Sequence, residues 1–335
     1  LKPESTLYNV SYAFRTEKAD RTKLEAAVNK LIERHESLRT HFENIYGRIV
    51  QVIDETATIT AEEITEDQIN SFAKPFDLSQ SPLVRAGLTE ETVVISFHHI
   101  AVDGESMPVF FRELNELYMG RELSDLTTQY GSFAATDRYT EENEKYWLDV
   151  FDEVPASLEL PADYPRSSEQ SFEGCNIYKR IDKNLHERIE DRCKEAEITP
   201  YVYYMACLNI LFSKLSGNED IVTGTPVSGR PGKHLNTIGM FVNTVALRSR
   251  PEGNKTIAEL FEEIKNSSIN AIENQNYPFN ELVKKLNTNS SERNPLFDVM
   301  FAYQSFEMTD ITFADKKAEL LPLVTESAKC DITFN

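Results

Sequence analysis

The sequence predicts an α/β protein with two lobes, and three observations carry that prediction. Short apolar runs typical of buried strands alternate along the chain with stretches of helical periodicity. The chain has 335 residues, more than a single hydrophobic core usually serves. The stretch ELPADYPRSSEQSFEG, residues 159–174, is rich in proline, serine and charge, as linkers are. We therefore predict an N-terminal lobe over 1–160, a linker over 161–174 and a C-terminal lobe over 175–335.

The composition indicates a soluble protein whose main partners are neither nucleic acid nor membrane. The net charge is −20, and an acidic surface repels phosphate backbones and anionic lipids. There is no run of about 18 apolar residues, and the first ten residues lack the basic and apolar parts of a signal peptide. The four cysteines are far apart and form no Cys-x-x-Cys pair, which favours reduced thiols and a cytoplasmic location.

In the N-terminal lobe the sequence predicts two helices and one buried strand. Residues 20–40 carry apolar side chains at helical spacing, with Asp20 as the N-cap and with His35 and Arg39 near the end. A nearly continuous apolar run predicts a strand over 92–99, and residues 107–118 are predicted to form the next helix.

Three elements are predicted in the C-terminal lobe. Residues 200–215 have the apolar pattern of a helix, and residues 221–227 suit a buried strand. Thr256 and Glu259 have the spacing of a capping box, which predicts that a helix begins there.

The most informative stretch is FHHIAVDGES, residues 97–106, at the junction of the predicted strand and helix. Adjacent residues of a strand point to opposite faces, so His98 and His99 cannot both face one cavity. This argues against a two-histidine metal ion site, and we predict no metal site. One interpretation is a buried histidine pair that stiffens a turn. The other is a general base, because a neutral imidazole suits that role and Asp103 can orient a ring nitrogen or pair with an arginine.

Several segments resemble the condensation domains of nonribosomal peptide synthetases, within the superfamily of chloramphenicol acetyltransferase-like acyltransferases. Residues 97–106 resemble their HHxxxDG signature, and RHESLRTHF, which begins at Arg34, resembles their RHExLRTxF. The other matches follow in the family's order: YGSFA at 130–134, IGMFVNT at 238–244 followed by Arg248, NQNYPF at 274–279 and RNPLF at 293–297. The family's first motif is absent, and KCDITFN resembles a segment after which the family usually continues. We therefore expect a domain trimmed at both ends.

The resemblance implies two chloramphenicol acetyltransferase-like lobes that form a V-shaped pseudo-dimer with a central tunnel. It also implies peptide-bond formation, in which the amine of an acceptor aminoacyl thioester attacks a donor aminoacyl or peptidyl thioester. The domain itself would bind no cofactor, because both substrates arrive on the 4'-phosphopantetheine arms of carrier proteins. The implied partners are an upstream donor and a downstream acceptor peptidyl carrier protein and an adjacent adenylation domain, within a multidomain synthetase of antibiotic biosynthesis.

The resemblance also implies roles for the residues of the histidine motif. His99 would be the base or the group that positions the acceptor amine, while His98 would face packing and set the local turn. Asp103 would pair with an arginine; Arg39 is our candidate, with a plain surface position as its alternative. Gly104 would let backbone amides approach the reacting carbonyl, or else it is simply a turn glycine.

Four further residues complete the predicted site. Asn243 and Thr244 would face the tunnel, or else form a buried polar pair at a strand end. Arg34 and Arg293 would give structural support; Arg293 would lie at an inter-lobe contact, or else be a solvated charge.

Three rival functions are open at this point. An epimerisation domain shares the histidine motif but lacks the Phe-Val-Asn-Thr found at 241–244, and another acyltransferase using CoA would need a basic nucleotide pocket. A non-catalytic module would only recruit carrier proteins or tailoring enzymes, and such modules usually lose motif residues. All four motif positions are present here, so an acyltransferase is favoured.

Overall fold

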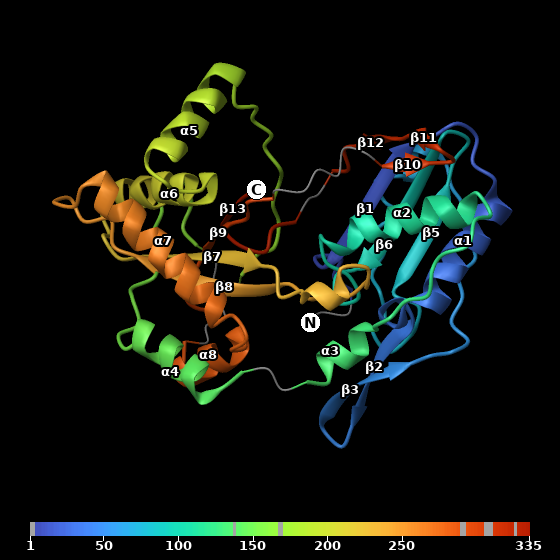
Figure 1. The fold of residues 1–335 in the computed structure, drawn as a ribbon, viewed down its shortest axis with the longest axis horizontal. Coiled ribbons are helices and arrows are strands. Elements are labelled where there is room, and N and C mark those ends of the chain that lie inside the picture. Colours follow the sequence, from blue (N-terminus) through green and yellow to red (C-terminus); the bar gives the residue numbers. More distant parts are fainter. Residues whose placement is uncertain (1–3, 137–138, 167–169, 289–292, 305–310, 325–326) are drawn as a thin grey trace. The chain divides into compact units, whose positions relative to one another are not determined.

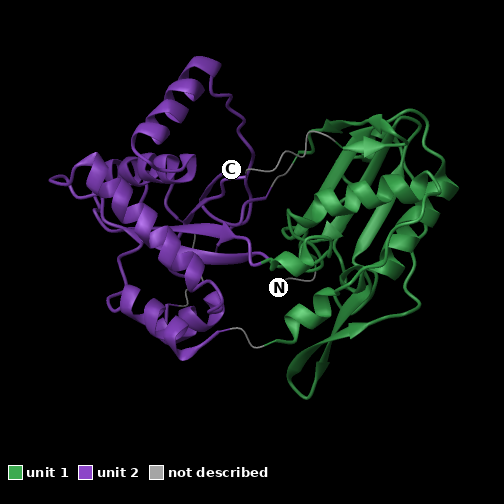
Figure 2. Ribbon diagram, in the orientation of Figure 1, with its two compact units in different colours: residues 1–136, 230–241, 305–325 green, residues 137–229, 242–304, 326–335 purple. Residues whose placement is uncertain are grey.

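The computed structural model describes residues 4–136, 139–166, 170–288, 293–304, 311–324 and 327–335. Helices and strands alternate along them, as the α/β prediction requires (Figure 1). The chain forms two compact units, each with its own sheet and helices (Figure 2). Unit 1 comprises residues 1–136, 230–241 and 305–325, and unit 2 comprises residues 137–229, 242–304 and 326–335.

These units are discontinuous, unlike the lobes that we predicted over 1–160 and 175–335. Residues 137–160 fall in unit 2, because Trp147 and Phe151 pack into its core. The predicted linker, 161–174, also falls in unit 2, except that 167–169 lie outside the described residues. Conversely, residues 230–241 leave the second half of the chain and join unit 1. The difference arises because packing contacts define a lobe, whereas the prediction relied on local composition.

Unit 1 is built on a five-stranded sheet with the order β12-β1-β6-β5-β4. Strands β1 and β6 pair antiparallel, with Asn9 directly opposite His98. Strands β2 and β3 form a separate hairpin. The elements of unit 1 are β1 (Asn9–Arg15), α1 (Arg21–Arg34), β2 (Thr40–Ile45), β3 (Arg48–Ile53), β4 (Glu62–Glu63), β5 (Val84–Leu88), β6 (Thr92–His98), α2 (Ser106–Tyr118), α3 (Tyr130–Ala134), β10 (Thr312–Phe313), β11 (Lys316–Lys317) and β12 (Glu319–Leu321), with 3₁₀ turns at Glu36–Arg39, Glu66–Gln68 and Gly232–His234.

The core of unit 1 follows from the alternation of side chains along β6. Val93, Ile95 and Phe97 belong to the main core, which also contains the buried faces of α1 and α2. Val94 points to the opposite face and packs in a smaller cluster with Phe72. Every residue of β6 is buried, so packing on both faces fixes the strand that ends at His98 and leads directly into His99.

The ends of the predicted elements of unit 1 are mostly correct. Strand β6 and helix α2 agree with prediction to within one residue at each end. The Asp20 carboxylate caps α1 as expected, since it accepts a hydrogen bond from Lys23 N at 3.0 Å. The helix nevertheless ends at Arg34, because His35 leaves it with extended backbone angles. His35 and Arg39 therefore lie beyond the helix and not within it.

Unit 2 is built on a four-stranded sheet with the order β13-β9-β7-β8. Strands β7 and β8 pair antiparallel, whereas β9 runs parallel to both β7 and β13. The elements of unit 2 are α4 (Glu141–Val150), α5 (Lys183–Glu195), α6 (Pro200–Ser216), β7 (Ile221–Val227), β8 (Asn243–Ser249), α7 (Ile257–Glu273), α8 (Phe279–Leu286), β9 (Val299–Phe301) and β13 (Ile332–Phe334).

The three predictions for the second half of the chain are confirmed. Helix α6 and strand β7 occupy the predicted ranges to within one residue. The capping box is present at the start of α7, where Thr256 N donates to the Glu259 carboxylate at 2.8 Å and Glu259 N donates to the Thr256 hydroxyl at 3.3 Å.

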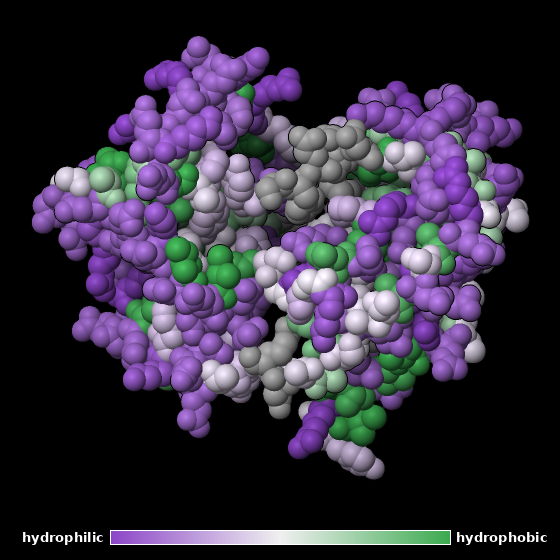
Figure 3. Space-filling view, viewed as in Figure 1, coloured by the Kyte–Doolittle hydropathy of each residue, from purple (hydrophilic) through white to green (hydrophobic). Residues whose placement is uncertain are grey.

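The visible surface of each unit is mainly polar (Figure 3). Apolar side chains gather over the β2–β3 hairpin, where Ile45, Tyr46, Ile49 and Ile53 are exposed. Within the described ranges, no helix is long and apolar enough to cross a membrane.

Candidate active site

The histidine pair lies where the buried strand β6 gives way to a turn. The amide of Ala101 donates to His98 O at 3.0 Å, and the amide of Val102 donates to His99 O at 3.3 Å, so the chain reverses immediately. The His98 side chain is buried, at 7% exposure, whereas His99 is partly exposed. As the strand alternation predicts, only one of the two rings lies in packing.

The buried ring of His98 holds the turn that follows it. Its Nδ1 accepts a hydrogen bond from the backbone N–H of Ile100 at 3.1 Å. The backbone N–H of His99 donates to Tyr8 O at 2.8 Å, which fastens the turn to the start of β1. The backbone around His99 is thus fixed on two sides, while the residue itself is partly exposed.

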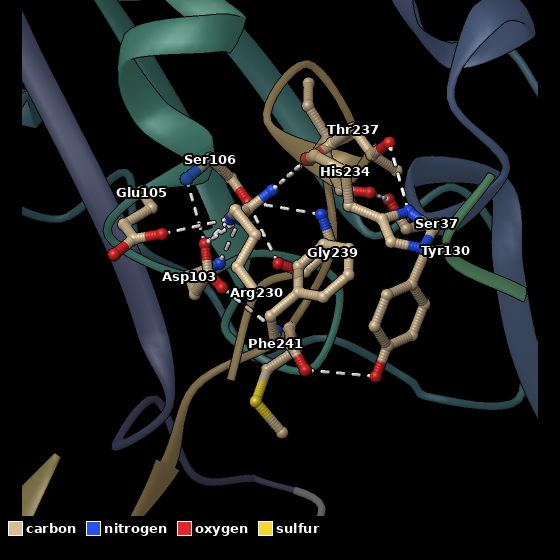
Figure 4. Close-up of polar contacts among 12 residues, drawn as sticks. Ser37, Asp103, Glu105, Ser106, Tyr130, Arg230, His234, Thr237, Gly239 and Phe241 are labelled. Atoms are coloured by element: carbon tan, nitrogen blue, oxygen red, sulfur yellow. Dashed lines mark hydrogen bonds and ion pairs between the residues drawn. The ribbon is translucent and has the colours of Figure 1, made fainter. Parts of the chain in front are cut away.

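Asp103 accepts hydrogen bonds on both carboxylate oxygens (Figure 4). Its Oδ1 lies 2.6 Å from Arg230 Nη2, 2.8 Å from Ser106 N and 2.7 Å from Ser106 Oγ. Its Oδ2 accepts from Phe241 N at 2.9 Å. The side chains of Asp103 and Arg230 are 4% and 2% exposed, so this is a buried and fully paired charge.

The expectation that Arg39 pairs with Asp103 is therefore wrong. Arg39 lies in the 3₁₀ turn after α1, and its Nη1 donates to Asp54 O at 3.5 Å. The partner of Asp103 is Arg230, which is 127 residues away in the sequence. The idea that an arginine neutralises Asp103 is correct; the choice of arginine failed because the pairing is long-range.

Arg230 also anchors the segment that carries it. Its guanidinium donates to His234 O at 3.1 Å and to Thr237 O, and it pairs with Glu105 at 3.2 Å. It lies over the ring of Phe241, 4.1 Å from the centroid. One side chain thereby organises both ends of residues 230–241, which we call the returning segment.

Side chains of unit 1 hold the backbone of Ile238 and Gly239, near the end of the returning segment. Ile238 N donates to His35 Nδ1 at 3.3 Å, and Ser37 Oγ donates to Ile238 O at 2.8 Å. Gly239 N donates to Ser106 Oγ at 3.1 Å, and the same hydroxyl lies 2.9 Å from Gly239 O. Both peptide groups are buried, so these bonds replace the ones that a neighbouring strand would supply.

Side chains also hold the backbone of Met240 and Phe241. The Tyr130 hydroxyl donates to Met240 O at 3.0 Å, and Phe241 N donates to Asp103 as described above. A side chain at position 239 would clash with the ring of Tyr130, so this close approach requires Gly239. The segments RHESLR, HHIAVDG, YGSFA and IGMFVNT are far apart in the sequence, and residues of all four meet here.

The sequence profile named "Condensation domain" matches residues 1–333 of the chain. The chain belongs to the condensation-domain family. The resemblance that the separate motifs suggested is thereby confirmed over nearly the whole length.

Curated relatives of this condensation domain are large peptide synthases. It is 40% identical to gramicidin S synthase 2 of Brevibacillus brevis over 95% of the chain and 39% identical to tyrocidine synthase 3 of Brevibacillus parabrevis over 98%. It is 36% identical to surfactin synthase subunit 2 of Bacillus subtilis over 98%. The chain spans only 8%, 5% and 10% of the lengths of these three relatives.

Solved structures share its fold at lower sequence identity. A four-domain nonribosomal peptide synthetase, bound to AMP and glycine, matches with a TM-score of 0.86 at 19% identity, over 99% of this chain and 28% of that one. The X-domain from teicoplanin biosynthesis in complex with OxyB matches with a TM-score of 0.85 at 23% identity, over 99% of this chain and 80% of that one. The two-unit α/β architecture is therefore the condensation-domain fold.

A second buried charge cluster supports the returning segment in this condensation domain. His35 Nε2 lies 2.8 Å from the Glu113 carboxylate, and Arg34 Nε donates to the same oxygen at 3.1 Å. Burial lowers the pKa of His35 although Glu113 opposes the shift, and Ile238 N–H occupies Nδ1, so the ring is neutral with its proton on Nε2. Burial raises the pKa of Glu113, but contact with His35 and Arg34 outweighs it, and the net direction is downward.

Gly104 and the pair Asn243 and Thr244 lie in two separate places. Gly104 lies in the exposed turn before α2, where its carbonyl accepts from Met107 N at 3.2 Å. Asn243 and Thr244 begin β8 in unit 2; Asn243 Oδ1 accepts from Thr244 N at 2.8 Å, and Asn243 Nδ2 donates to Gln275 O. Both residues are polar and lie at a strand end, but both are partly exposed, unlike the buried pair that was the alternative to a tunnel-facing role.

Arg293 connects distant parts of unit 2. It donates to the Asp298 carboxylate at 2.9 Å, pairs with Glu159 at 2.5 Å and lies 3.3 Å from Leu158 O. All three partners belong to unit 2, so these contacts are not the inter-lobe contact that we expected. The side chain is only 15% exposed, so Arg293 is no solvated charge either, and its support is structural within unit 2. Arg34 is also structural, since besides Glu113 it donates to Ser124 O at 2.7 Å.

Sequence reasoning did not assign Arg230, Ser106, Tyr130 or Ser37 to the site. Tyr130 and Ser37 lie inside motifs that were recognised, but their hydroxyls were given no role. Ser106 closes the FHHIAVDGES stretch, but its hydroxyl was given no role either. Arg230 lies outside every recognised motif, and the one available signal was that a buried Asp103 needs a cation somewhere in the chain.

Proposed function

We propose that this domain catalyses amide formation between a donor aminoacyl or peptidyl thioester and the amine of an acceptor aminoacyl thioester. The observation that carries the proposal is the partly exposed His99, held at the end of a fully buried strand by the anchored His98 turn. Membership of the condensation-domain family supports this choice of reaction over other uses of a histidine.

In the proposed step the acceptor nitrogen attacks the thioester carbonyl. A C–N bond forms and the C–S bond breaks, so the donor arm leaves as a thiol and the acceptor arm carries the longer chain. The attacking amine loses one proton, and the departing sulfur gains one. His99 either accepts that proton and passes it to the sulfur, or it positions the amine and directs the proton towards the sulfur. Gly104, in the exposed turn beside Asp103, would let backbone amides approach the developing oxyanion.

Both substrates would arrive on the 4'-phosphopantetheine arms of peptidyl carrier proteins, with no cofactor held by the domain itself. The proposed partners are an upstream donor carrier, a downstream acceptor carrier and an adjacent adenylation domain. The similarity to large synthases and to a four-domain synthetase supports this assembly. The four cysteines are all free thiols, which supports the proposed cytoplasmic location.

We further propose that His98, Asp103 and Arg230 act by holding the loop that bears His99, and that Asn243 and Thr244 face the substrate arms from unit 2. Both residues are partly exposed at the start of β8, which leaves them accessible. Thr244→Val should then raise the KM for the acceptor carrier, with kcat less affected. A selective fall in kcat would contradict a binding role.

The test is the intact mass of an acceptor carrier protein after it is mixed with a loaded donor carrier and this domain. We expect a gain of one donor acyl unit, and His99→Ala should slow this by roughly 10²–10⁴-fold, the usual scale of a positioned acid or base. An unchanged rate in the variant would contradict the role of His99.

A recruiting module is the second candidate, and the fold similarity to the X-domain bound to OxyB favours it. Such a module would give no mass gain with any loaded pair and would instead bind a carrier or tailoring enzyme. The same mass measurement therefore separates the two functions.

A further inference from the structure

The buried ring of His98 has two aromatic rings of unit 1 as neighbours. Phe76 meets it edge-on, with centroids 6.2 Å apart and planes at 84°. Tyr8 is the second ring, with centroids 6.3 Å apart and planes at 33°. Phe76 is 6% exposed, so its contact with the His98 ring is buried. Nδ1 of the same ring accepts the hydrogen bond from the Ile100 amide.

Arg85 fixes the position of Phe76. This arginine lies on β5, next to β6, and its guanidinium lies 3.9 Å from the centroid of the Phe76 ring. Its Nη1 donates to Lys74 O at 2.6 Å, and its Nη2 donates to Pro75 O at 2.8 Å. The planar fork thus binds two successive carbonyls and stacks on the ring that follows them.

The start of β1 holds the same loop from the other side. The Asn9 side-chain amide donates to Lys74 O at 2.8 Å, and Asn9 is the residue directly opposite His98 in the sheet. Side chains from β1 and β5, the two strands that flank β6, therefore both bind the carbonyl of Lys74, two residues before Phe76.

We propose that Arg85 and Phe76 are positioning residues for the proposed condensation reaction, which they serve through His98. Arg85 clamps residues 74–75, Phe76 presses on the His98 ring, and that ring holds the Ile100 amide and so the turn that presents His99. Neither residue touches the reacting atoms. The inference rests on the proposed function, but its structural half can be measured without any catalysis.

The first test follows the Ile100 amide by hydrogen exchange in the intact domain. Phe76→Leu keeps an apolar side chain but removes the edge-on ring, so Ile100 exchange should speed up by roughly 3- to 10-fold, the range that aromatic pairs contribute. Arg85→Lys keeps the charge but loses the fork and should act in the same direction.

The matched controls are Phe72→Leu and Arg15→Lys. Phe72 packs with Val94 on the same sheet as His98, and Arg15 pairs with Glu319 at the surface of β1. Phe72→Leu should lower the melting temperature about as much as Phe76→Leu while Ile100 exchange stays unchanged. Equal Ile100 exchange in all four variants and wild type would overturn the clamp.

The second test is kinetic and uses the loaded carrier assay. Phe76→Leu and Arg85→Lys should each lower kcat by roughly 3- to 10-fold with KM within about twofold, and the double variant should lose no more than the larger single effect. Unchanged kcat beside faster Ile100 exchange would overturn the positioning role. Absence of any amide with wild-type protein would reject the proposed function instead, while Ile100 exchange still decides the clamp.

Discussion

Arg230 Nη2 lies 2.6 Å from Asp103 Oδ1, and the two side chains are 2% and 4% exposed although 127 residues separate them. A pair this deeply buried has no water to replace either partner. The loop after His99 and the returning segment of residues 230–241 are therefore held as one structure. The following predictions test that relationship and the packing around it.

Removing Arg230 should destabilise the domain strongly. Arg230→Met leaves the Asp103 carboxylate buried without its cation, and breaking such a pair typically costs about 3–5 kcal/mol. Urea unfolding followed by circular dichroism measures the loss. Arg112 is the matched control, because it contacts the same segment from the surface, through Asn236, and Arg112→Met should cost less than about 0.5 kcal/mol. Similar losses for the two variants would contradict the buried-pair interpretation.

Removing the Tyr130 hydroxyl should loosen the end of the returning segment. Tyr130→Phe keeps the ring against Gly239 but deletes the bond to Met240 O, with an expected loss of about 0.5–1.5 kcal/mol. Hydrogen–deuterium exchange at the amides of Ile238, Gly239 and Phe241 should rise, because side chains accept their hydrogen bonds. Tyr164→Phe is the control, since Tyr164 is 83% exposed in unit 2. Unchanged exchange in Tyr130→Phe would contradict this account.

Stability should fall as the pH drops below about 6.5, because two histidines are buried neutral. Burial lowers the pKa of His35, and burial together with Lys233 and Arg230 lowers the pKa of His234. As the pH falls, these histidines therefore bind protons in the unfolded chain before they do so in the folded one. Their contribution to the free energy of unfolding is complete above the unfolded pKa. Below that pKa it is lost by up to about 1.4 kcal/mol per pH unit for each histidine.

The contribution of His35 can be isolated by substitution. His35→Asn should make the slope of unfolding free energy against pH shallower between about pH 6.5 and 5.5, because one fewer histidine titrates there. His186 is exposed on α5, and His186→Asn should leave the slope as it is in wild type. Equal slopes in all three proteins would show that His35 is not the source.

The core of unit 2 contains a polar link that should be costly to break. The buried Asn209 amide donates to Ser249 Oγ at 2.8 Å and accepts from Thr223 Oγ1 at 3.0 Å. Asn209→Leu leaves both hydroxyls without that partner, and each unsatisfied group costs about 1–3 kcal/mol. Exposed Asn280 supplies the control, Asn280→Leu, with an effect near zero. A stable Asn209→Leu variant in thermal unfolding would refute this.

Local features of the fold were predictable, because their causes lie within a few residues of sequence. The Asp20 cap and the Thr256 capping box are such cases, as is the alternation that buries His98 and leaves His99 partly exposed. Arg230 could not be chosen over Arg39 in this way, since nothing near either residue shows which one meets Asp103. The lobe limits failed for the same reason, because packing across the chain decides where residues 137–160 and 230–241 belong.

The discontinuity of unit 1 also constrains how the chain can fold during synthesis. Ribosomes add roughly 5–20 residues per second, so Arg230 follows Asp103 after roughly 6 to 25 s. Ile311 and Phe313, which belong to the same core, emerge later still. Unit 1 therefore cannot complete its core before most of unit 2 has been synthesised. The two sheets are complete only after β12 and β13 have been synthesised, and the Asp103 carboxylate must stay hydrated until Arg230 has been added to the chain.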